Sequence, residues 1–176
     1  TPTLNYNGDD TFSFTVSDGE LSDTAEVTLT IDPVNDAPTL ATVSDVSFDE
    51  DSSTSISVSG SDIDGDDLIY SISDGTDITA TLSGSDISFS APANFNGSEP
   101  FTVTVSDGEL SDSQNITVTV NAVNDTPVAT AGLSGTTNED QNIVITLSGA
   151  DIDGDNLTFS LDTDPTNGSV VIDGTL

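Results

Sequence analysis

The sequence predicts an all-β protein built from tandem β-sandwich repeats of about 89 residues. Two observations predict this: motifs return at one fixed spacing, and apolar residues alternate with small polar ones along short segments. Val34-Asn35-Asp36-Ala37-Pro38 returns 89 residues later as Val123-Asn124-Asp125-Thr126-Pro127, and Asp62-Ile63-Asp64-Gly65-Asp66 returns as Asp151 to Asp155. A unit of this length can bury its own core, so we expect independent domains joined like beads on a string.

The strands are predicted from period-two alternation, starting with residues 1–32. Two half-buried strands are expected there, one containing Phe12, Phe14 and Val16 and the other Val27, Leu29 and Ile31, joined through 17–20. Residues 33–121 form the complete repeat, with strands predicted at 42–48, 53–60, 67–73, 77–82, 85–90, 99–107 and 113–121. Turn-forming Asp, Gly, Ser and Asn clusters separate them. One apolar face per strand and the lack of a helical stripe predict antiparallel sheets packed as an immunoglobulin-like sandwich.

The two ends of the chain each correspond to part of a repeat. Residues 1–32 match the last third of the unit, and 122–176 match its first three-fifths. Neither part closes a sandwich alone, since each leaves strand edges and half a core uncovered. Two explanations remain open: the chain is a segment of a longer repetitive protein, or the tail of one copy completes the head of the next by strand addition.

Composition excludes several classes of function. The chain has 32 acidic residues and no Lys, Arg, His or Cys. Without basic side chains it has no means of neutralising phosphate, so nucleic-acid binding and attraction to anionic membranes are not expected. Without His or Cys it has no Ser-His-Asp or Cys-His nucleophile and no zinc site of the usual ligands. No signal peptide or membrane-spanning run is evident, and we expect a segment of a mature protein that does not insert into a membrane.

The carboxylates have no cationic side chain to pair with, so they must be solvated, hydrogen-bonded or bound to metal ions. Oxygen ligands in this number suit calcium better than transition metals. The run 62–67 is not an EF-hand, because Gly stands fourth and Ser73 twelfth where that loop needs Gly sixth and Glu twelfth. It is an Asp-x-Asp turn between strands, which has either a cation-binding role or only a turn-forming one.

Several motifs together resemble cadherin repeats. They are Gly60-Ser61-Asp62-Ile63-Asp64 followed by the strand 67–72, the segment 105–111 with the strand 115–120, and the linker Val123-Asn124-Asp125-Thr126-Pro127. The Val-Asn-Asp-Ala-Pro linker at 34–38 and the segment 5–12 are more closely similar to the cadherin-like tandem repeats of giant bacterial RTX-type surface adhesins. The resemblance covers the whole chain and implies an extracellular, cell-surface or secreted protein.

The resemblance also implies Ca2+ at each joint between repeats, held by the base of one repeat, the linker and the top of the next. For the first joint it implies the ligands Asn35, Asp36, Asp62, Asp64, Asp67 and Asp107, with Asn7, Asp9 or Asp10 from the preceding repeat. For the second joint it implies Glu50, Asn124, Asp125, Asp151, Asp153 and Asn156, with Glu139 as the counterpart of Glu50 in the following repeat. The linker lacks the second Asn of the cadherin form, and 94–99 replaces the Asp-Arg-Glu segment of that family, so the number of ions per joint is open.

These observations predict a non-enzymatic, calcium-rigidified spacer in a surface adhesin or fibre, whose partners are the neighbouring repeats. The alternative is a subunit of a surface filament that polymerises by strand exchange between half-repeats of different copies. A hydrolase that uses Asp62 and Asp64 as paired carboxylates is a third hypothesis, but no cluster of sugar-stacking aromatic residues accompanies them.

Overall fold

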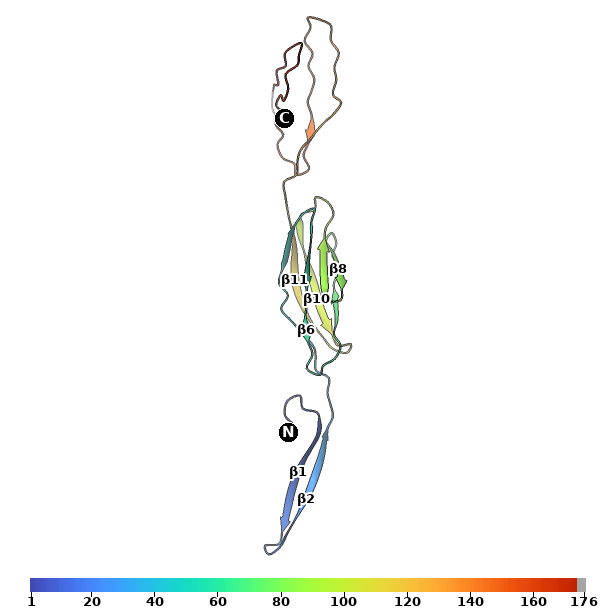
Figure 1. Ribbon diagram of the computed structural model, residues 1–176, viewed down its shortest axis with the longest axis vertical. Coiled ribbons are helices and arrows are strands. Elements are labelled where there is room, and N and C mark those ends of the chain that lie inside the picture. The colour runs from blue at the N-terminus through green and yellow to red at the C-terminus, as the bar shows by residue number, and fades with distance from the viewer. Residues whose placement is uncertain (174–176) are drawn as a thin grey trace.

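The computed structural model describes residues 1–173 of the chain, and within them every regular element is a strand, as predicted. The molecule is an elongated rod: an N-terminal hairpin, a central sandwich and a C-terminal segment follow one another along its long axis (Figure 1). No helix among the described residues has the length and apolar character needed to cross a bilayer.

The central sandwich contains nine strands. They are β3 (Thr39–Leu40), β4 (Val46–Asp49), β5 (Ser53–Ser57), β6 (Gly60–Ser61), β7 (Ile69–Ile72), β8 (Thr79–Ser83), β9 (Asp86–Ser90), β10 (Gly97–Ser106) and β11 (Ser111–Asn121). One sheet has the order β4-β11-β10-β7, another has the order β5-β9-β8, and β3 pairs with β6. The alternating positions of the sequence therefore give each main sheet one apolar face.

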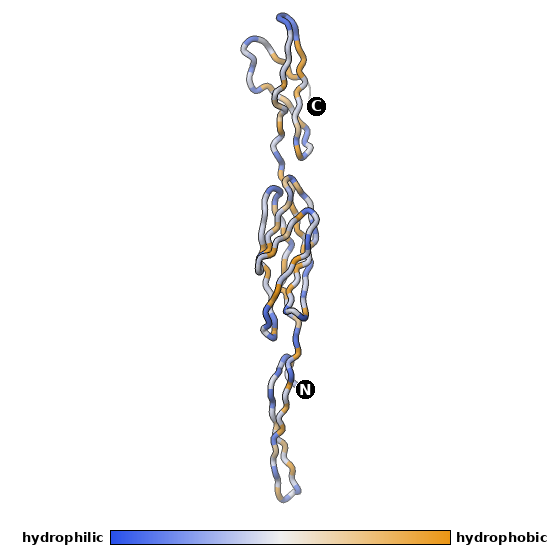
Figure 2. Tube along the Cα trace, turned by 90° about the vertical axis from the view of Figure 1, so that its right-hand side faces the viewer, coloured by the Kyte–Doolittle hydropathy of each residue, from blue (hydrophilic) through white to orange (hydrophobic). Residues whose placement is uncertain are grey.

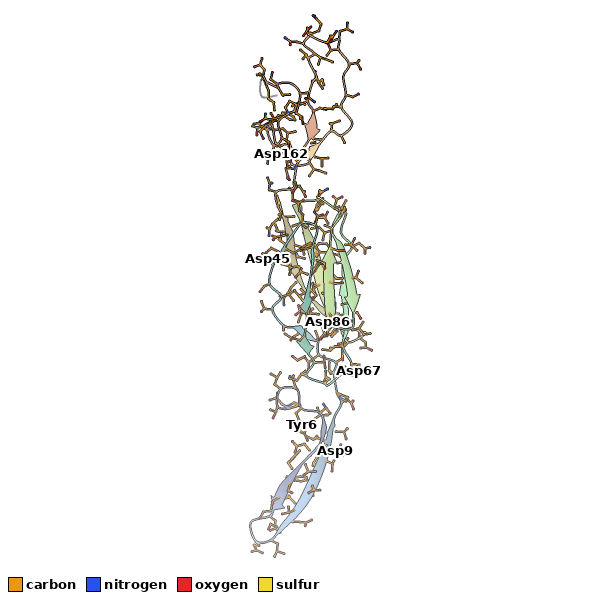
Figure 3. All side chains as sticks on the ribbon, turned by 45° about the horizontal axis from the view of Figure 1, so that its top comes forward. Tyr6, Asp9, Asp45, Asp67, Asp86 and Asp162 are labelled. Carbon is orange, nitrogen blue, oxygen red and sulfur yellow. The ribbon has the colours of Figure 1, made fainter. Side chains whose placement is uncertain are left out.

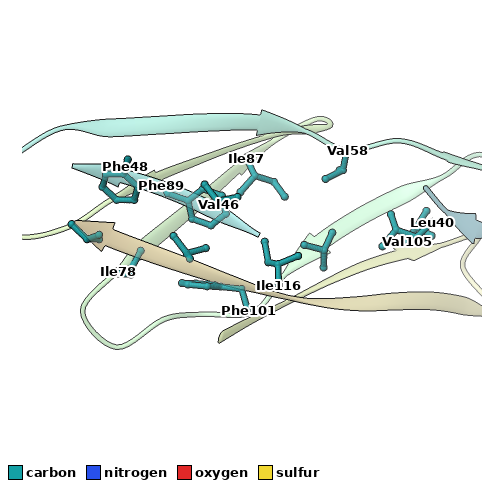
Figure 4. Close-up of a cluster of buried hydrophobic side chains, with 13 residues drawn as sticks. Leu40, Val46, Phe48, Val58, Ile78, Ile87, Phe89, Phe101, Val105 and Ile116 are labelled. Carbon is teal, nitrogen blue, oxygen red and sulfur yellow. The ribbon is translucent and has the colours of Figure 1, made fainter. Parts of the chain in front are cut away.

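The core lies between these two faces (Figure 4). Phe89 of β9 and Phe101 of β10 meet edge to face with ring centroids 5.6 Å apart, and both side chains are at most 1% exposed. Val103, Val105 and Val118 are completely buried beside them. The inward positions of β10 and β11 alternate with polar ones, which confirms the predicted sandwich pattern.

The prediction of one strand at 42–48 was wrong. The chain forms β3 next to β6, crosses between the sheets at 41–45, and then forms β4, which runs parallel to β11 rather than antiparallel. Side-chain hydrogen bonds join the crossing segment to β11. Gln114 accepts the N–H of Val43 at 3.0 Å, and Asp45 accepts the N–H of Thr117 at 2.8 Å, so both backbone donors have an acceptor. The predicted strand 53–60 is likewise divided into β5 and β6, and a groove of about 340 Å³ lies between 41–46 and 56–59.

The N-terminal segment forms the predicted hairpin of β1 (Gly8–Ser17) and β2 (Ser22–Ile31). Its register repeats that of β10 and β11, since Phe12 faces Val27 as Phe101 faces Ile116. The strands are not half-buried as expected. Phe12 and Phe14 are each 50% exposed because no second sheet covers them, and apolar positions run along the open hairpin in Figure 2.

The C-terminal segment repeats the entry into the sandwich. Strand β12 (Val128–Ala129) pairs with β13 (Gly149–Ala150), as β3 pairs with β6. Between these two strands, apolar side chains such as Ile143, Ile145 and Leu147 are more than one-third exposed. After β13, residues 151–173 contain no strand.

Candidate metal centres at the two joints

The Asp-x-Asp turn after β6 is organised by Asp62. Its Oδ1 accepts the backbone N–H of Asp64 at 2.8 Å, of Gly65 at 3.1 Å and of Asp66 at 3.4 Å. Gly65 has a φ of 84°, which an L-residue rarely adopts, and this allows the tight turn. As a result, Asp62, Asp64 and Asp66 each present a carboxylate oxygen within 4.8 Å of the others.

The preceding linker docks onto this turn. The backbone N–H of Asp36 donates to Asp64 Oδ2 at 2.8 Å, and Asn35 Nδ2 donates to Asp107 Oδ2 at 3.0 Å. The N–H groups of Leu110 and Glu109, together with Asn35, hold the pKa of the Asp107 carboxyl below its ordinary value. Three segments that are distant in sequence thus bring their oxygens to the first joint.

The second joint repeats this geometry. The backbone N–H of Asp125 donates to Asp153 Oδ2 at 2.6 Å. Asp151 Oδ1 accepts the N–H groups of Asp153 and Asp155, each at 3.1 Å. The same linker-to-turn contact therefore forms twice from residues 89 positions apart.

The base of the central repeat adds carboxylates to the second joint. Glu50 is only 5% exposed, and its Oε1 accepts the N–H of Val123 at 2.6 Å. The next residue, Asp51, is in the left-handed region with a φ of 59°, and its Oδ1 accepts the N–H of Asn94 at 3.0 Å. The Glu50 contact joins the end of β4 to the linker that follows β11, and the Asp51 contact joins it to the loop between β9 and β10.

Four other carboxylates of the second joint surround Asp125. Burial raises the pKa of its carboxyl, and the negative charges of Asp153, Asp51, Glu50 and Asp151 raise it further. Asp125 Oδ2 is buried and has no hydrogen-bond partner among the described residues. The same is true of Asp62 Oδ2 at the first joint.

These features fit a hard cation. An unpartnered buried carboxylate oxygen is unusual in a folded protein, and here it lies among further carboxylates in a chain without Lys, Arg or His. Carboxylate and amide oxygens are the ligands that Ca2+ prefers.

The structure brings together most, but not all, of the residues predicted from the sequence. Asn35, Asp36, Asp62, Asp64 and Asp107 meet at the first joint through the contacts above. At the second joint, Glu50, Asp151 and Asp153 lie near Asp125. The Asn124 side chain donates to the backbone carbonyl of the next residue, Asp125.

Three predicted ligands take no part in these contacts. Asp67, Glu139 and Asn156 are exposed and form no side-chain hydrogen bond with described residues. Figure 3 shows Asp67 at the end of the central repeat that faces Tyr6 and Asp9. The spacing did not reveal that the Asp62 side chain closes its turn before Asp67 is reached.

Of the three residues expected from the preceding repeat, Asn7 is the one that lies beside the linker and the turn. Asn7 lines a recess of about 240 Å³ together with Asp36 and Asp64. Asp9 and Asp10 instead bond within their hairpin, to the Thr30 hydroxyl and the Thr11 N–H. Asn7 is therefore the candidate donor from this side of the joint.

Sequence reasoning missed Asp51 and Asp66 as candidate donors. Both lie in motifs that recur, as Asp140 and Asp155, and Asp66 continues the alternation of Asp62 and Asp64. This recurrence in the sequence could have identified both residues as candidate metal ligands.

The relative and the solved structures that resemble this chain are matched over only a small part of their own length. The chain is 35% identical over 96 residues to chitinase A of Pseudoalteromonas piscicida, an alignment that covers 53% of this chain and 12% of that protein. The chain thus spans about an eighth of this curated relative. Among solved structures, an endo-fucoidan hydrolase of glycoside hydrolase family 107, MfFcnA4_H294Q, matches with 26% identity and a TM-score of 0.38, covering 69% of this chain and 20% of the other.

The surface layer protein SbsC, domains 1–6, matches with 17% identity and a TM-score of 0.38, covering 82% of this chain and 20% of that one. The family model described as a bacterial Ig domain matches three times, at residues 1–30, 35–119 and 124–176. These matches extend over nearly the whole sequence, and the central one coincides with the sandwich. The chain therefore belongs to the bacterial Ig domain family, of which it carries three consecutive matches.

Proposed function

We propose that this chain is a calcium-rigidified structural spacer, with cadherin-like joints, in an extracellular cell-surface adhesin or fibre. The observation that carries the proposal is the linker-to-turn contact present at both joints, Asp36 to Asp64 and Asp125 to Asp153. At each joint a buried carboxylate oxygen lacks a hydrogen-bond partner, and this supports a cation as the missing partner.

The mechanism follows from the charge at the joints. Without cations, carboxylates of the linker and the turn repel one another at distances shorter than the roughly 8 Å screening length of physiological salt. Calcium supplies a positive charge that carboxylates of the linker and of the turn bind together, so the linker is held against the turn. At the second joint, Glu50 and Asp51 add carboxylates from the preceding repeat. The Asp125 carboxylate of the linker lies close enough to feel their charges and that of Asp153.

The backbone supports the same role. Pro38 is buried at the end of the first linker, and proline fixes its own φ and restricts the residue before it. The partners of each repeat are then its neighbours along the rod. The function of the rod is to extend the protein away from the cell surface, and it has no catalytic role.

The relatives support a modular role. The chitinase match covers only 12% of that protein, as expected for a module carried within a larger chain. Thirty-two acidic residues without a basic one give a surface that stays soluble in strong salt, which suits an extracellular setting.

The test is a calcium titration of the chelated protein, followed by thermal unfolding and hydrodynamic radius. We expect a higher unfolding temperature and a more extended, less variable shape. When calcium exceeds its dissociation constant about one-hundredfold, a single site adds about 2.7 kcal/mol of stability. The double variant Asp36→Ala/Asp64→Ala should lose much of this response.

The control is Asp162→Ala/Asp164→Ala, which also removes two negative charges but at exposed positions outside the joint contacts. It should respond to calcium as the unmodified chain does. An unchanged unfolding temperature and radius at millimolar calcium would contradict the proposal.

A second candidate function is that of a subunit in a surface filament assembled by strand exchange. The specific observation in its favour is that apolar faces are exposed at both ends of the rod, on the β1–β2 hairpin and on 143–147. Concentration-dependent association separates this function from that of a monomeric spacer segment.

A further inference from the structure

The strand β5 of the central sandwich has one open edge. β3 lies beside β6, and just after β3 the N–H of Ala41 still donates to the carbonyl of Ser59 at 2.9 Å. The chain then leaves this sheet through the crossing at 41–45 and forms β4 against β11. Among the described strands, β5 therefore pairs on one side only, with β9.

The alternation along β5 shows which backbone groups face this open edge. The N–H of Val58 donates towards β9, to the carbonyl of Ser85 at 2.9 Å, whereas the carbonyl of Ser59 points the other way, to Ala41. Successive residues of a strand direct their N–H and C=O groups to opposite sides. The backbone groups of Ser55 and Ser57 thus face away from β9, and no backbone hydrogen bond joins them to the crossing segment.

The groove of about 340 Å³ lies beside this edge. It is lined by 41–46 on one side and by 56–59 on the other. Val43 and Ile56 are half-buried in its walls, and Val58, labelled in Figure 4, is buried. A strand placed here would direct alternate side chains into the groove and the others to solvent.

The edge also lacks the residues that normally block the addition of a strand. Native sheets protect their edges with charged side chains, proline or bulges. The sequence of β5, Ser53–Ser57, contains neither a charged residue nor a proline. Its outward side chains, Ser53, Ser55 and Ser57, are small and leave the backbone accessible.

Charge decides which occupant the groove accepts. Asp45 lines the groove, and Asp86 lies beside β5, where it accepts the hydroxyl of Ser57. Asp45 Oδ1 accepts the N–H of Thr117, but no hydrogen bond from a described residue engages its Oδ2. The chain has 32 acidic residues and no Lys or Arg, so it repels a second copy of itself and attracts a basic segment.

We propose that the open edge of β5 is a docking site for an extended segment of another protein, in which apolar residues alternate with Lys or Arg. The segment runs antiparallel to β5, in the line that β3 begins, and its backbone pairs with Ser55 and Ser57. Its apolar side chains enter the groove, and its basic side chains lie on the outer face with Ser57 and Asp86. The rod then has an attachment point on its side, which does not depend on calcium at the joints.

The experiment titrates a capped peptide of alternating Lys and Val residues, with Lys at both ends, into the full chain at physiological ionic strength. In an added strand, only every second N–H faces β5, and here these are the N–H groups of Lys, because Lys lies on the outer face opposite Ser55 and Ser57. N-methylation of two Lys residues should weaken binding at least about tenfold. N-methylation of two Val residues should leave binding unchanged, since those N–H groups face solvent.

The two methylated peptides carry the same charge, so they separate strand addition from attraction between charges. Equal affinities of both would overturn the proposal. A peptide with Glu in place of Lys should not bind, and equal binding of that peptide would overturn the basic character of the partner. Amide chemical shifts should change at 41–46 and 53–59. Changes centred on 62–66 or 151–155 would show binding to the carboxylates of the joints and would also overturn the proposal.

Variants of the chain test the same edge. Ser55→Pro removes an N–H that faces outward, a position where an edge strand tolerates proline, and it should abolish peptide binding. Ser55→Lys keeps the backbone and places a positive charge opposite a Lys of the peptide, which is unfavourable across a strand pair. Its matched control is Ser88→Lys, at the exposed residue of β9 directly opposite Ser55. Ser55→Lys should weaken binding more than the control does, and equal weakening would contradict docking at this edge.

Discussion

The carboxylate of Glu50 accepts the backbone N–H of Val123 across 2.6 Å, so the residue after β4 holds the first part of the linker after β11. Glu50 is also the only buried charged residue among those described, at 5% exposure. A buried carboxylate in this position has both a structural contact and a charge that faces the joint.

Two substitutions separate these roles of Glu50. Glu50→Ala leaves the Val123 N–H without its acceptor and should destabilise the chain by about 1–3 kcal/mol even in chelator. Glu50→Gln keeps an acceptor oxygen and removes the charge, so it should stay closer to the unmodified chain in chelator but gain less stability from calcium. Thermal unfolding with and without calcium measures both effects; an equal calcium response in Glu50→Gln would contradict a role in the cation site.

Asp125→Asn should have opposite effects in the two conditions. Folding raises the pKa of this carboxyl, so its ionisation destabilises the folded state above the folded pKa, and the cost is relieved as pH falls towards 3.8. At neutral pH in chelator, the variant should therefore unfold at a higher temperature than the unmodified chain. In calcium it should unfold at a lower one, because a ligand is lost.

The control for Asp125→Asn is Asp164→Asn, an exposed position outside the joint contacts. It should change the unfolding temperature less than Asp125→Asn does, both in chelator and in calcium. If Asp125→Asn were less stable in both conditions, the negative charge of Asp125 would not destabilise the folded chain in chelator, and the prediction would be wrong.

Glu99 predicts a specific acid dependence. Burial by itself raises the pKa of its carboxyl, but N–H groups of Asp77, Thr76 and Ile78 outweigh this and leave the pKa below the ordinary 4.5. A carboxyl with a lowered folded pKa contributes stability above its unfolded pKa and loses it as pH falls through the folded pKa.

Glu99→Gln should therefore cost about 1–2 kcal/mol near neutral pH, in the lower part of the range for hydrogen bonds to a charged group because the side chain is partly exposed. The difference from the unmodified chain should shrink as the pH falls below 4.5 and through the lowered folded pKa. Urea unfolding at several pH values tests this. Glu109→Gln is the control, since the Glu109 side chain is exposed and makes no hydrogen bond to described residues, and its difference should stay near zero.

Phe101 and Phe12 provide a comparison of identical residues one repeat apart. Phe101 is 1% exposed in the core, whereas Phe12 is 50% exposed on the hairpin. Phe101→Ala should destabilise the central sandwich by about 3–5 kcal/mol through loss of burial and a residual cavity. Phe12→Ala should change it by less than about 0.5 kcal/mol. Urea unfolding at concentrations where the chain is monomeric measures both, and similar losses would mean that the hairpin and sandwich share a core.

The sequence was sufficient to predict the sandwich because its signals are local and repeated. Alternation along Phe101, Val103 and Val105 marks one buried face, and the same face recurs in the register of β1 and β2. The linker and the Asp-x-Asp turn were located by their recurrence, and the hydrogen bonds of Asp36 and Asp125 join them in space.

Other features depend on contacts that spacing does not encode. The crossing at 41–45 depends on two hydrogen bonds to the distant strand β11: Gln114 accepts the N–H of Val43, and Asp45 accepts the N–H of Thr117. The position of Asp67 depends on how tightly the Asp62 side chain closes its turn. The exposure of Phe12 depends on which segment faces it, and alternation gives only the face that requires covering.

The parallel pairing of β4 with β11 has a mechanical consequence. The chain enters the central repeat through the linker before β3 and leaves it after β11, at the opposite end of the rod (Figure 1). Tension along the rod therefore pulls β4 and β11 in opposite directions, and the ladder from Val46–Val118 to Asp49–Asn121 is loaded in shear. Its hydrogen bonds share the force, whereas a hairpin pulled open from its ends would lose them one after another. A short strand of four residues thus gives the repeat its resistance to stretching.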